Sequence, residues 1–313
     1  MKTMRTIIVA AALAAGCVCA GAQAQTRIAL GHTASVDYVA AFAALGEGYF
    51  KKRGLDVELI VIPLNSNIPV GLQSGSLQVG GPTAPILIQA IDGGLDLVAL
   101  AAASLSARET AAIYGIVART GSNIRSPQDF VGRKVGAPGL GASMHITFRH
   151  WLRLKGVDYR KVSFVEVPFP QHPDVLKGGS IDAVLTADPF MPRILKENIG
   201  YVVANYGYDI EPGQLSSIYT TTRDWATKNA AAASGFREAI AEGGAFANNP
   251  ANLARMRELV GVYLKLPPPV IATTTIPPQQ AQISAAQLNW WIDVLKAQDM
   301  LRNPPSAAAV LWN

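Results

Sequence analysis

Short apolar runs alternate with helical patterns along most of the chain. The first group of runs predicts strands at residues 27–31, 56–62, 77–80 and 95–102. The segments between them predict helices at 36–53, 68–73 and 84–91. A second group repeats this order, with strands at 134–137, 162–167 and 181–186 and helices at 143–155, 173–177 and 189–198. Alternating strands and helices favour a mainly parallel sheet with helices on its faces, so we expect two α/β lobes.

The pattern changes after the second group, where one strand at 216–222 is followed mostly by helices. These helices are rich in alanine and amphipathic, which suits a cover over a sheet, and they are expected at 230–247, 250–264 and 281–298. If they pack on the first lobe, the chain crosses between the lobes twice, near 113–118 and near 206–217. Two crossings form a hinge. We therefore predict a clam-shell in which residues 25–115 and 212–313 form lobe 1 and residues 116–211 form lobe 2.

The first 24 residues have the features of a secretory signal peptide. Lys2 and Arg5 precede an apolar run at residues 7–20, and small residues end at Ala24, where we expect cleavage. The apolar run is shorter than the roughly 20 residues that a spanning helix needs. We therefore predict export to the periplasm as a soluble protein.

Both cysteines, Cys17 and Cys19, lie in this leader, so the cleaved chain has no thiol for a disulfide or for catalysis. A lipid anchor on Cys17 is the less favoured alternative, because the residues before Cys17 lack the leucine usual in a lipoprotein cleavage box.

The formal net charge of +5 falls to +3 when Lys2 and Arg5 are removed with the leader. The basic residues are scattered and are not interleaved with aromatic residues, so we expect no nucleic-acid partner. The four histidines show no spacing to carboxylates that is typical of a metal site. We expect neither a metal nor a cofactor, while a small anionic ligand is compatible with this charge.

Polar residues gather where the predicted strands end, which is where open α/β sheets bind their ligands. The candidate ligand-binding residues are His32, Thr33, Ser35, Asn65, Thr83, Gly141, Ala142, Ser143, Thr186 and Asp188. Their hydroxyl and amide groups suit a ligand rich in oxygen. Ordinary turn chemistry explains any one of them, but their recurrence after successive strands favours a binding site.

The turn from Gly139 to Ser143 leads directly into a predicted helix. Glycine lets the backbone turn sharply, and the first amides of the helix have no acceptor within it, so this end favours a carboxylate or sulfonate. The alternative is that Ser143 caps the helix and the glycines only shape the loop. Because Asp188 would repel an anion, we expect it to cap the next helix or to bind an arginine; Arg193 is a candidate, although a solvated Arg193 is favoured.

Four stretches carry a resemblance to a known family. They are LGEGYFKKRGLDVELI (45–60), GLQSGSLQVGGPTAP (71–85), SPQDFVGRKVGAPGLGAS (126–143) and LKGGSIDAVLTADPF (176–190). They resemble the periplasmic substrate-binding proteins of ABC importers of the nitrate, sulfonate and taurine type, which share their fold with thiamine-pyrimidine synthases. The resemblance implies the two-lobed periplasmic-binding-protein fold of type II, with a ligand trapped between the lobes and no catalysis.

The resemblance also implies a function and a division of the site. First-lobe contacts would come from Thr33, Ser35, Asn65 and Thr83, and second-lobe contacts from Gly141, Ala142, Ser143, Thr186 and Asp188. The ligand would be a small organic anion, a sulfonate or a carboxylate, including aromatic ones, delivered to a membrane permease with its ATPase subunit. Inorganic anions rank lower, because histidine is the only cation in these loops. We expect the protein to act as a monomer.

Two other functions stay open at this stage. The first is an enzyme like the thiamine-pyrimidine synthases; those relatives carry a cysteine-rich segment, whereas this chain has no cysteine beyond Cys19. The second is a periplasmic sensor subunit that binds the same class of ligand, which the sequence does not separate from an importer.

Overall fold

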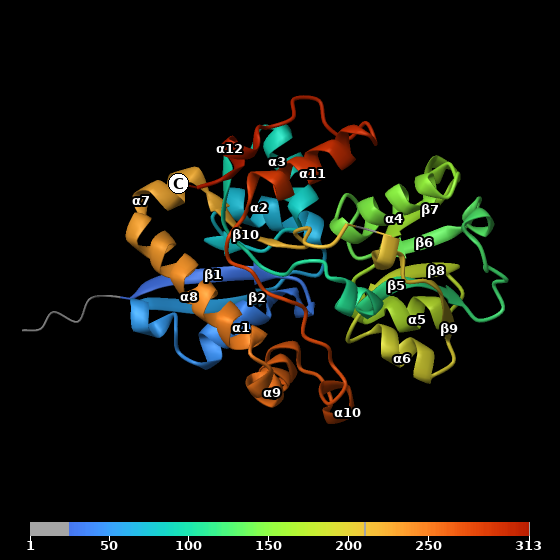
Figure 1. The fold of residues 1–313 in the computed structure, drawn as a ribbon, viewed down its shortest axis with the longest axis horizontal. Helices are drawn as coiled ribbons and strands as arrows, with labels where there is room; N and C mark the ends of the chain where they lie inside the picture. The colour runs from blue at the N-terminus through green and yellow to red at the C-terminus, as the bar shows by residue number, and fades with distance from the viewer. Residues whose placement is uncertain (1–24, 210, 313) are drawn as a thin grey trace, which may run out of the picture.

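The computed structural model describes residues 25–209 and 211–312 and contains two α/β lobes side by side (Figure 1). The predicted leader, with Cys17 and Cys19, lies outside the described residues. Each lobe has its own five-stranded sheet. We call the lobe that contains the first strand lobe 1 and the other lobe 2.

The sheet of lobe 1 has the strand order β2-β1-β3-β10-β4. Its strands are β1 (Thr26–His32), β2 (Leu55–Val61), β3 (Val79–Gly80), β4 (Leu97–Ala102) and β10 (Ile218–Thr222). Strand β1 pairs in parallel with β2 and β3, whereas β10 is antiparallel to both of its neighbours, β3 and β4. Four strands therefore run in one direction and β10 alone opposes them.

Helices cover both faces of this sheet (Figure 1). One layer contains α1 (Val39–Gly46), α8 (Ala230–Asn248) and α9 (Leu253–Leu264), and the other contains α2 (Ile68–Gln73), α3 (Ala84–Asp92), α11 (Ala285–Lys296) and α12 (Ala307–Val310). Two short helices, α7 (Arg223–Lys228) and α10 (Pro268–Ile271), lie at the periphery. Alternate residues of β4 divide between the layers, Val98 and Leu100 with α1 and α8, and Leu97 and Ala99 with α3 and α11. This division follows from the two-residue period of a strand and explains why β4 is apolar throughout.

Lobe 2 repeats the plan of lobe 1, with the strand order β7-β6-β8-β5-β9. Its strands are β5 (Tyr114–Arg119), β6 (Lys134–Ala137), β7 (Ser163–Glu166), β8 (Ala183–Ala187) and β9 (Gly200–Ala204). Here β5 is the strand that opposes its neighbours, β8 and β9. Helix α4 (Ser143–Leu154) covers one face, and α5 (His172–Lys177) and α6 (Met191–Lys196) cover the other.

Two segments cross between the lobes, residues 103–113 and residues 205–217. Each contains a short 3-10 helix, Arg108–Ile113 and Tyr206–Asp209. The crossings are bonded to each other: the N–H of Ser106 donates to Gln214 O at 2.8 Å, that of Gly213 to Ser106 O at 2.7 Å, and that of Ser216 to Ser104 O at 3.0 Å. The paired crossings form the hinge between the lobes.

Most of the expected strands and helices are present, but the expected position of the first crossing is wrong. Residues 114–119 form β5, an inner strand of lobe 2, and the crossing precedes it. Strand β9 was not expected either, because it lies at the edge of the sheet, where its side chains are only partly buried. The second crossing lies where it was expected. The residue at which each lobe begins and ends within the crossings stays a prediction.

Among the described residues, no helix combines the length and the apolar character that crossing a membrane requires.

Candidate functional site

A cavity of about 90 Å³ lies where the two crossings meet both lobes. Lobe 1 contributes the loop after β1, and lobe 2 contributes the start of α4 together with Tyr114, Phe169 and Ala187. The crossings contribute residues 104–106 and 214–216, and the chain after α10 contributes Pro277 and Trp291. At about 15 Å³ for one water, the cavity has room for a small solute.

Ser35 and Asp37 form the lobe 1 side of the cavity. Ser35 begins the 3-10 helix Val36–Tyr38: its Oγ accepts from the N–H of Asp37 at 3.2 Å and donates to Asp37 Oδ2 at 2.9 Å. The Oγ of Ser104, from the first crossing, donates to Asp37 Oδ1. These bonds hold the half-buried carboxylate of Asp37 at the cavity wall.

The start of α4 forms part of the lobe 2 side, through Ser143 and Met144 in its first turn and Thr147 in its second. The N-cap of α4 is Ala142, so the alternative in which Ser143 caps the helix is wrong. The hydroxyl of Ser143 instead donates to Ser216 O of the second crossing at 3.0 Å. The positive end of the helix dipole therefore lies at the cavity.

Three aromatic side chains line the cavity between these polar ends: Tyr114, Phe169 and Trp291. The indole N–H of Trp291 donates to Leu215 O at 2.8 Å, and Phe169 stacks on Phe190 with their ring centroids 5.8 Å apart. Burial, with a smaller contribution from the charge of Asp37, raises the pKa of Tyr114 to about 12. Tyr114 is therefore a neutral phenol at neutral pH.

The turn before α4 connects the two lobes directly. Gly141 has a φ of +81°, as expected for a glycine that turns the backbone sharply. Its N–H donates to His145 Nδ1 at 2.9 Å, and its carbonyl accepts from Gln89 Nε2 of lobe 1 at 2.9 Å. Burial, assisted by the charge of Arg149, lowers the pKa of His145 to about 3. The ring is therefore neutral at physiological pH, as an accepting Nδ1 requires.

Further hydrogen bonds join the lobes. Glu166, at the end of β7, accepts from Ser66 Oγ of lobe 1 at 2.8 Å and from the N–H of Leu140 at 2.9 Å. Elsewhere, Gln298 Nε2 of lobe 1 donates to Ile146 O of α4 at 3.1 Å. The lobes are thus in contact.

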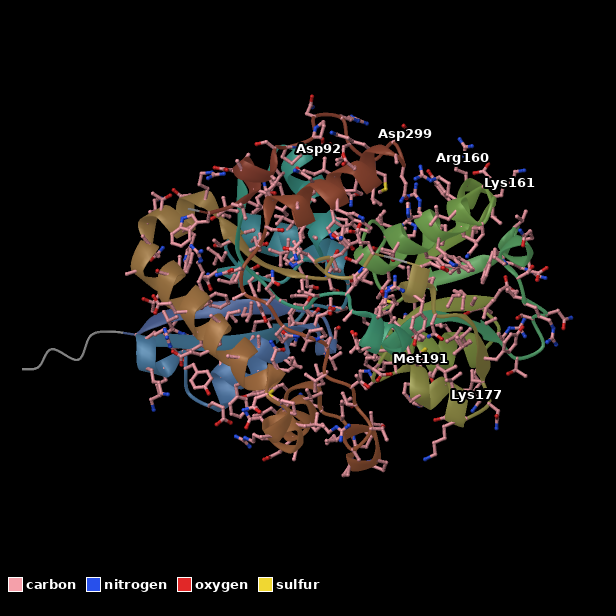
Figure 2. All side chains as sticks on the ribbon, viewed as in Figure 1. Asp92, Arg160, Lys161, Lys177, Met191 and Asp299 are labelled. Atoms are coloured by element: carbon pink, nitrogen blue, oxygen red, sulfur yellow. The ribbon has the colours of Figure 1, made fainter. Side chains whose placement is uncertain are left out.

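Opposite charges also face each other across the lobes. Figure 2 shows Asp299 of lobe 1 and Arg160 and Lys161 of lobe 2 at the same edge of the molecule. A hydrogen bond to Asp158 is the main cause that raises the pKa of Arg160, and the charge of Asp299 adds to it.

Of the ten candidate binding residues, Ser35 and Ser143 line the cavity. His32, Thr33, Asn65 and Thr83 are buried in lobe 1 and are not among the residues that line the cavity. His32 Nδ1 lies 2.9 Å from Thr33 O, and Asn65 Oδ1 accepts from the N–H of Thr83 at 2.9 Å. The hydroxyl of Thr83 in turn accepts from the N–H of Ser143 in lobe 2 at 3.3 Å. Thr83 thus joins the two lobes, and ligand contacts from these four residues stay a prediction.

Thr186 and Asp188 flank Ala187, which lines the cavity. Asp188 donates its N–H to Ile113 O at 2.7 Å, and burial raises the pKa of its carboxyl to about 6 although hydrogen bonds from Thr275 lower it. The expectation that Asp188 caps the next helix is wrong, because the N-cap of α6 is Phe190. The alternative pairing with Arg193 is wrong too, since Arg193 pairs with Glu197 at 2.9 Å and Asp174 at 4.0 Å.

Sequence reasoning missed Asp37 and the cavity residues of the crossings, such as Ser104 and Gln214. Asp37 follows Ser35 by two positions, so extending the search along that loop would have found it. The crossings were interpreted only as a hinge. Their place in the cavity depends on how they pair with each other, which no local pattern indicates.

No group of three or more histidine, cysteine, aspartate or glutamate side chains that could hold a metal ion is found in residues 25–209 and 211–312.

Comparison with known proteins supports the fold. Residues 35–252 match the NMT1/THI5-like family, a segment that includes both crossings and the whole of lobe 2. The chain belongs to this family. The resemblance seen in the four sequence motifs is thereby confirmed.

The curated relatives of this NMT1/THI5-like protein include several binding proteins. The bicarbonate-binding protein CmpA of Synechococcus elongatus is 25% identical over 235 residues, which are 68% of this chain and 52% of CmpA. The formylaminopyrimidine-binding protein of Halalkalibacterium halodurans is 30% identical over 145 residues, 46% of this chain and 42% of that protein. The chain thus spans about half the length of CmpA.

Solved structures confirm the two-lobed periplasmic-binding-protein fold of this family member. The alkanesulfonate-binding protein SsuA from Xanthomonas axonopodis pv. citri, bound to MOPS, has a TM-score of 0.76 at 18% identity, covering 92% of this chain and 98% of SsuA. The periplasmic nitrate-binding protein NrtA from Synechocystis PCC 6803 has a TM-score of 0.76 at 17% identity, covering 91% and 85%. At these identities the likeness shows the fold.

Proposed function

We propose that this protein is the solute-binding component of an ABC importer and captures a small organic anion, a sulfonate or a carboxylate, between its lobes. The observation that carries the proposal is the cavity at the hinge, which is walled by both lobes and both crossings. A ligand in that position contacts both lobes only when they are closed, so it shifts the population toward the closed form.

The start of α4 supports an anionic ligand. Ser143 and Met144, in its first turn, line the cavity. The N–H of Ser143 donates to Thr83 Oγ1, while that of Met144 has no acceptor within the helix. The names of relatives point in the same direction, since they include binding proteins for bicarbonate and for nitrate or nitrite. The alkanesulfonate-binding protein SsuA, whose structure is similar, is also named as a binding protein for an anion.

The rest of the lining supports an organic rather than an inorganic anion. Tyr114, Phe169 and Trp291 present large apolar surfaces to the cavity, and no lysine, arginine or histidine is among the described residues that line it. An inorganic anion gains little from such a wall, whereas an organic group buries apolar area against it.

The binding residues follow from this position. Ser35 and Ser143 would contact the ligand directly. The wall around them would be shaped by His32, Thr33, Asn65, Thr83, Gly141, Ala142, Thr186 and Asp188.

The cellular setting is part of the same proposal. The leader would direct the protein to the periplasm, where the closed form would deliver its ligand as a monomer to a membrane permease with its ATPase subunit. Relatives named as ATP-binding proteins for nitrate import and bicarbonate transport support such a partner. A binding role rather than an enzymatic one agrees with the names of the relatives.

A thermal-shift screen of the exported protein tests the function. The panel contains alkyl and aryl sulfonates, carboxylates, nitrate, bicarbonate and pyrimidines. A true ligand at about 100 times its dissociation constant should stabilise the protein by about 2.7 kcal/mol. We expect stabilisation by one or more organic anions and little by nitrate. A protein that none of these compounds stabilises would contradict the proposal.

A further inference from the structure

We propose that residues 274–281, which we call the strap, act as a third strand of the hinge, and that Asn248 is the positioning residue that holds the strap in place. The strap belongs to the chain between α10 and α11, which runs alongside the first crossing (Figure 1). This inference goes beyond the proposed function, because it concerns how the lobes move and not which ligand they bind.

The strap pairs with the first crossing as a neighbouring β-strand would. The N–H of Leu105 donates to Pro278 O at 3.0 Å, and the N–H of Gln280 donates to Ala103 O at 3.1 Å. The second crossing bonds to the opposite edge of the first one, through Ser106. Three segments therefore lie side by side at the hinge, with the first crossing in the middle.

Asn248, at the end of α8, holds the other edge of the strap. Its Nδ2 donates to Gln279 O at 2.8 Å, and its Oδ1 accepts from the N–H of Gln279 at 2.9 Å. A side-chain amide offers both a donor and an acceptor, so it bonds to both backbone groups of Gln279 as a further strand would. The side chain of Gln279, which is 6% exposed, bonds to Pro277 O and to the N–H of Ala40 in α1. The strap is thus bonded along both of its edges.

The strap limits where the first crossing can bend. On the lobe 1 side, the hydrogen bond from Leu105 to the strap fixes the crossing up to that residue. On the lobe 2 side, Ile113 O accepts from the N–H of Asp188 at 2.7 Å. Bending of the first crossing is therefore confined to residues 106–112, between these two anchors.

The strap also reaches the cavity. Pro277 lines the cavity, and so does Thr110, which lies in the part of the first crossing that can bend. Loosening the strap would therefore widen the range of lobe arrangements and move part of the cavity wall at the same time.

Removing the Asn248 side chain tests this inference in the ligand-free protein, so the result does not depend on the proposed function. Spin labels on cysteines introduced at Lys177 of lobe 2 and Lys228 of lobe 1 measure the distribution of distances between the lobes. Asn252→Ala is the matched control, because the Asn252 side chain also donates to a backbone carbonyl near the end of α8, Phe246 O, which lies outside the strap.

We expect Asn248→Ala to broaden the distance distribution relative to the wild type. Hydrogen exchange of the Leu105 and Gln280 amides, which bond the strap to the first crossing, should become about tenfold faster. Asn252→Ala should change neither measurement. Asn248→Asp keeps the acceptor for the N–H of Gln279 but loses the donor, so it should lie between the wild type and Asn248→Ala.

Three results would overturn the inference. The first is a wild-type distance distribution with wild-type exchange rates in both Asn248 variants. The second is an equal change in Asn248→Ala and Asn252→Ala. The third needs no variant, and so decides the matter even if the variants fail to fold: wild-type Leu105 and Gln280 amides that exchange as fast as those of an exposed loop.

Discussion

Gly141, in the loop before α4, adopts a backbone conformation that few other amino acids allow. Gly141 lies in the left-handed region, and a β-carbon at this position would come within 3.0 Å of Gln89 Oε1 of lobe 1. Its N–H and carbonyl bond to His145 and Gln89. Gly141 thus allows the sharp turn before α4 and also takes part in the contact between the lobes.

Replacing Gly141 by alanine should lower ligand affinity by about tenfold or more, because the new β-carbon displaces Gln89 and loosens the closed form. It should also destabilise the protein by about 1–2 kcal/mol through backbone strain. Gly132→Ala is the matched control, since Gly132 has a φ of +76° and no atom within 4 Å of its would-be β-carbon. Denaturation and calorimetry should show similar stability losses but an affinity loss only for Gly141→Ala. Equal affinity losses in both variants would assign Gly141 a purely structural role.

Asp188 makes stability depend on pH in the direction opposite to most carboxylates. Burial raises the pKa of its carboxyl from 3.8 to about 6. Between these two pH values the folded protein keeps a proton on Asp188 that the unfolded chain releases. The contribution of protonated Asp188 to the free energy of unfolding is therefore fully present below about pH 4 and is lost as the pH rises through about 6.

Asp188→Asn should therefore raise the free energy of unfolding at neutral pH by about 1–3 kcal/mol relative to the wild type, and the difference should shrink toward about pH 4. Urea denaturation at several pH values measures this, with the exposed Asp174→Asn as the control. Wild-type and Asp188→Asn curves that stay parallel across this range would show that Asp188 does not titrate in this way.

Among the elements, β7 and α4 carry the contacts that hold lobe 2 against lobe 1. Glu166, the last residue of β7, bonds to Ser66 of lobe 1 and to Leu140 in the turn before α4. Later in the same helix, Ile146 accepts from Gln298 of lobe 1. The strand end and the helix start therefore act together as the closing edge of lobe 2.

Glu166→Ala should weaken ligand binding by about three- to tenfold, because the hydrogen bond from Ser66 of lobe 1 to Glu166 of lobe 2 is lost. Glu197→Ala is the matched control: Glu197 is a partly exposed carboxylate of lobe 2 that pairs with Arg193 one turn away. Small-angle scattering of the ligand-free Glu166→Ala protein should show a larger radius of gyration than that of the control. Unchanged affinity and radius would exclude a role for Glu166 in closure.

The sequence predicts most of the helices and strands of this molecule, but it does not predict which residues meet at the cavity. The sequence predicts the strands β1, β2 and β6 and the turn at Gly141. The spacing of apolar residues and the presence of a glycine can each be read from a short stretch of sequence. Strand β5 was not, since the short run at 114–119 is equally compatible with a connection between lobes. Asp37, Ser104 and Gln214 share a cavity only because the crossings pair with each other, and this pairing is a property of the tertiary structure.

At the scale of the whole molecule, two lobes of the same topology meet at paired crossings. Each lobe contains one antiparallel strand, β5 or β10, and in each case that strand directly follows a crossing. The hinge is therefore attached to inner strands of both sheets. Such an attachment lets the lobes move as rigid bodies around the cavity, which is the motion that a solute receptor requires.

The most direct test of the account is a crystal structure of the exported protein with the compound that binds most tightly in the screen. We predict ligand density in the cavity between Ser35 and Ser143, with an anionic group at the start of α4 and an apolar part against Trp291. Density for the ligand elsewhere on the protein, with this cavity empty, would contradict the central claim that the molecule closes on its ligand at the hinge.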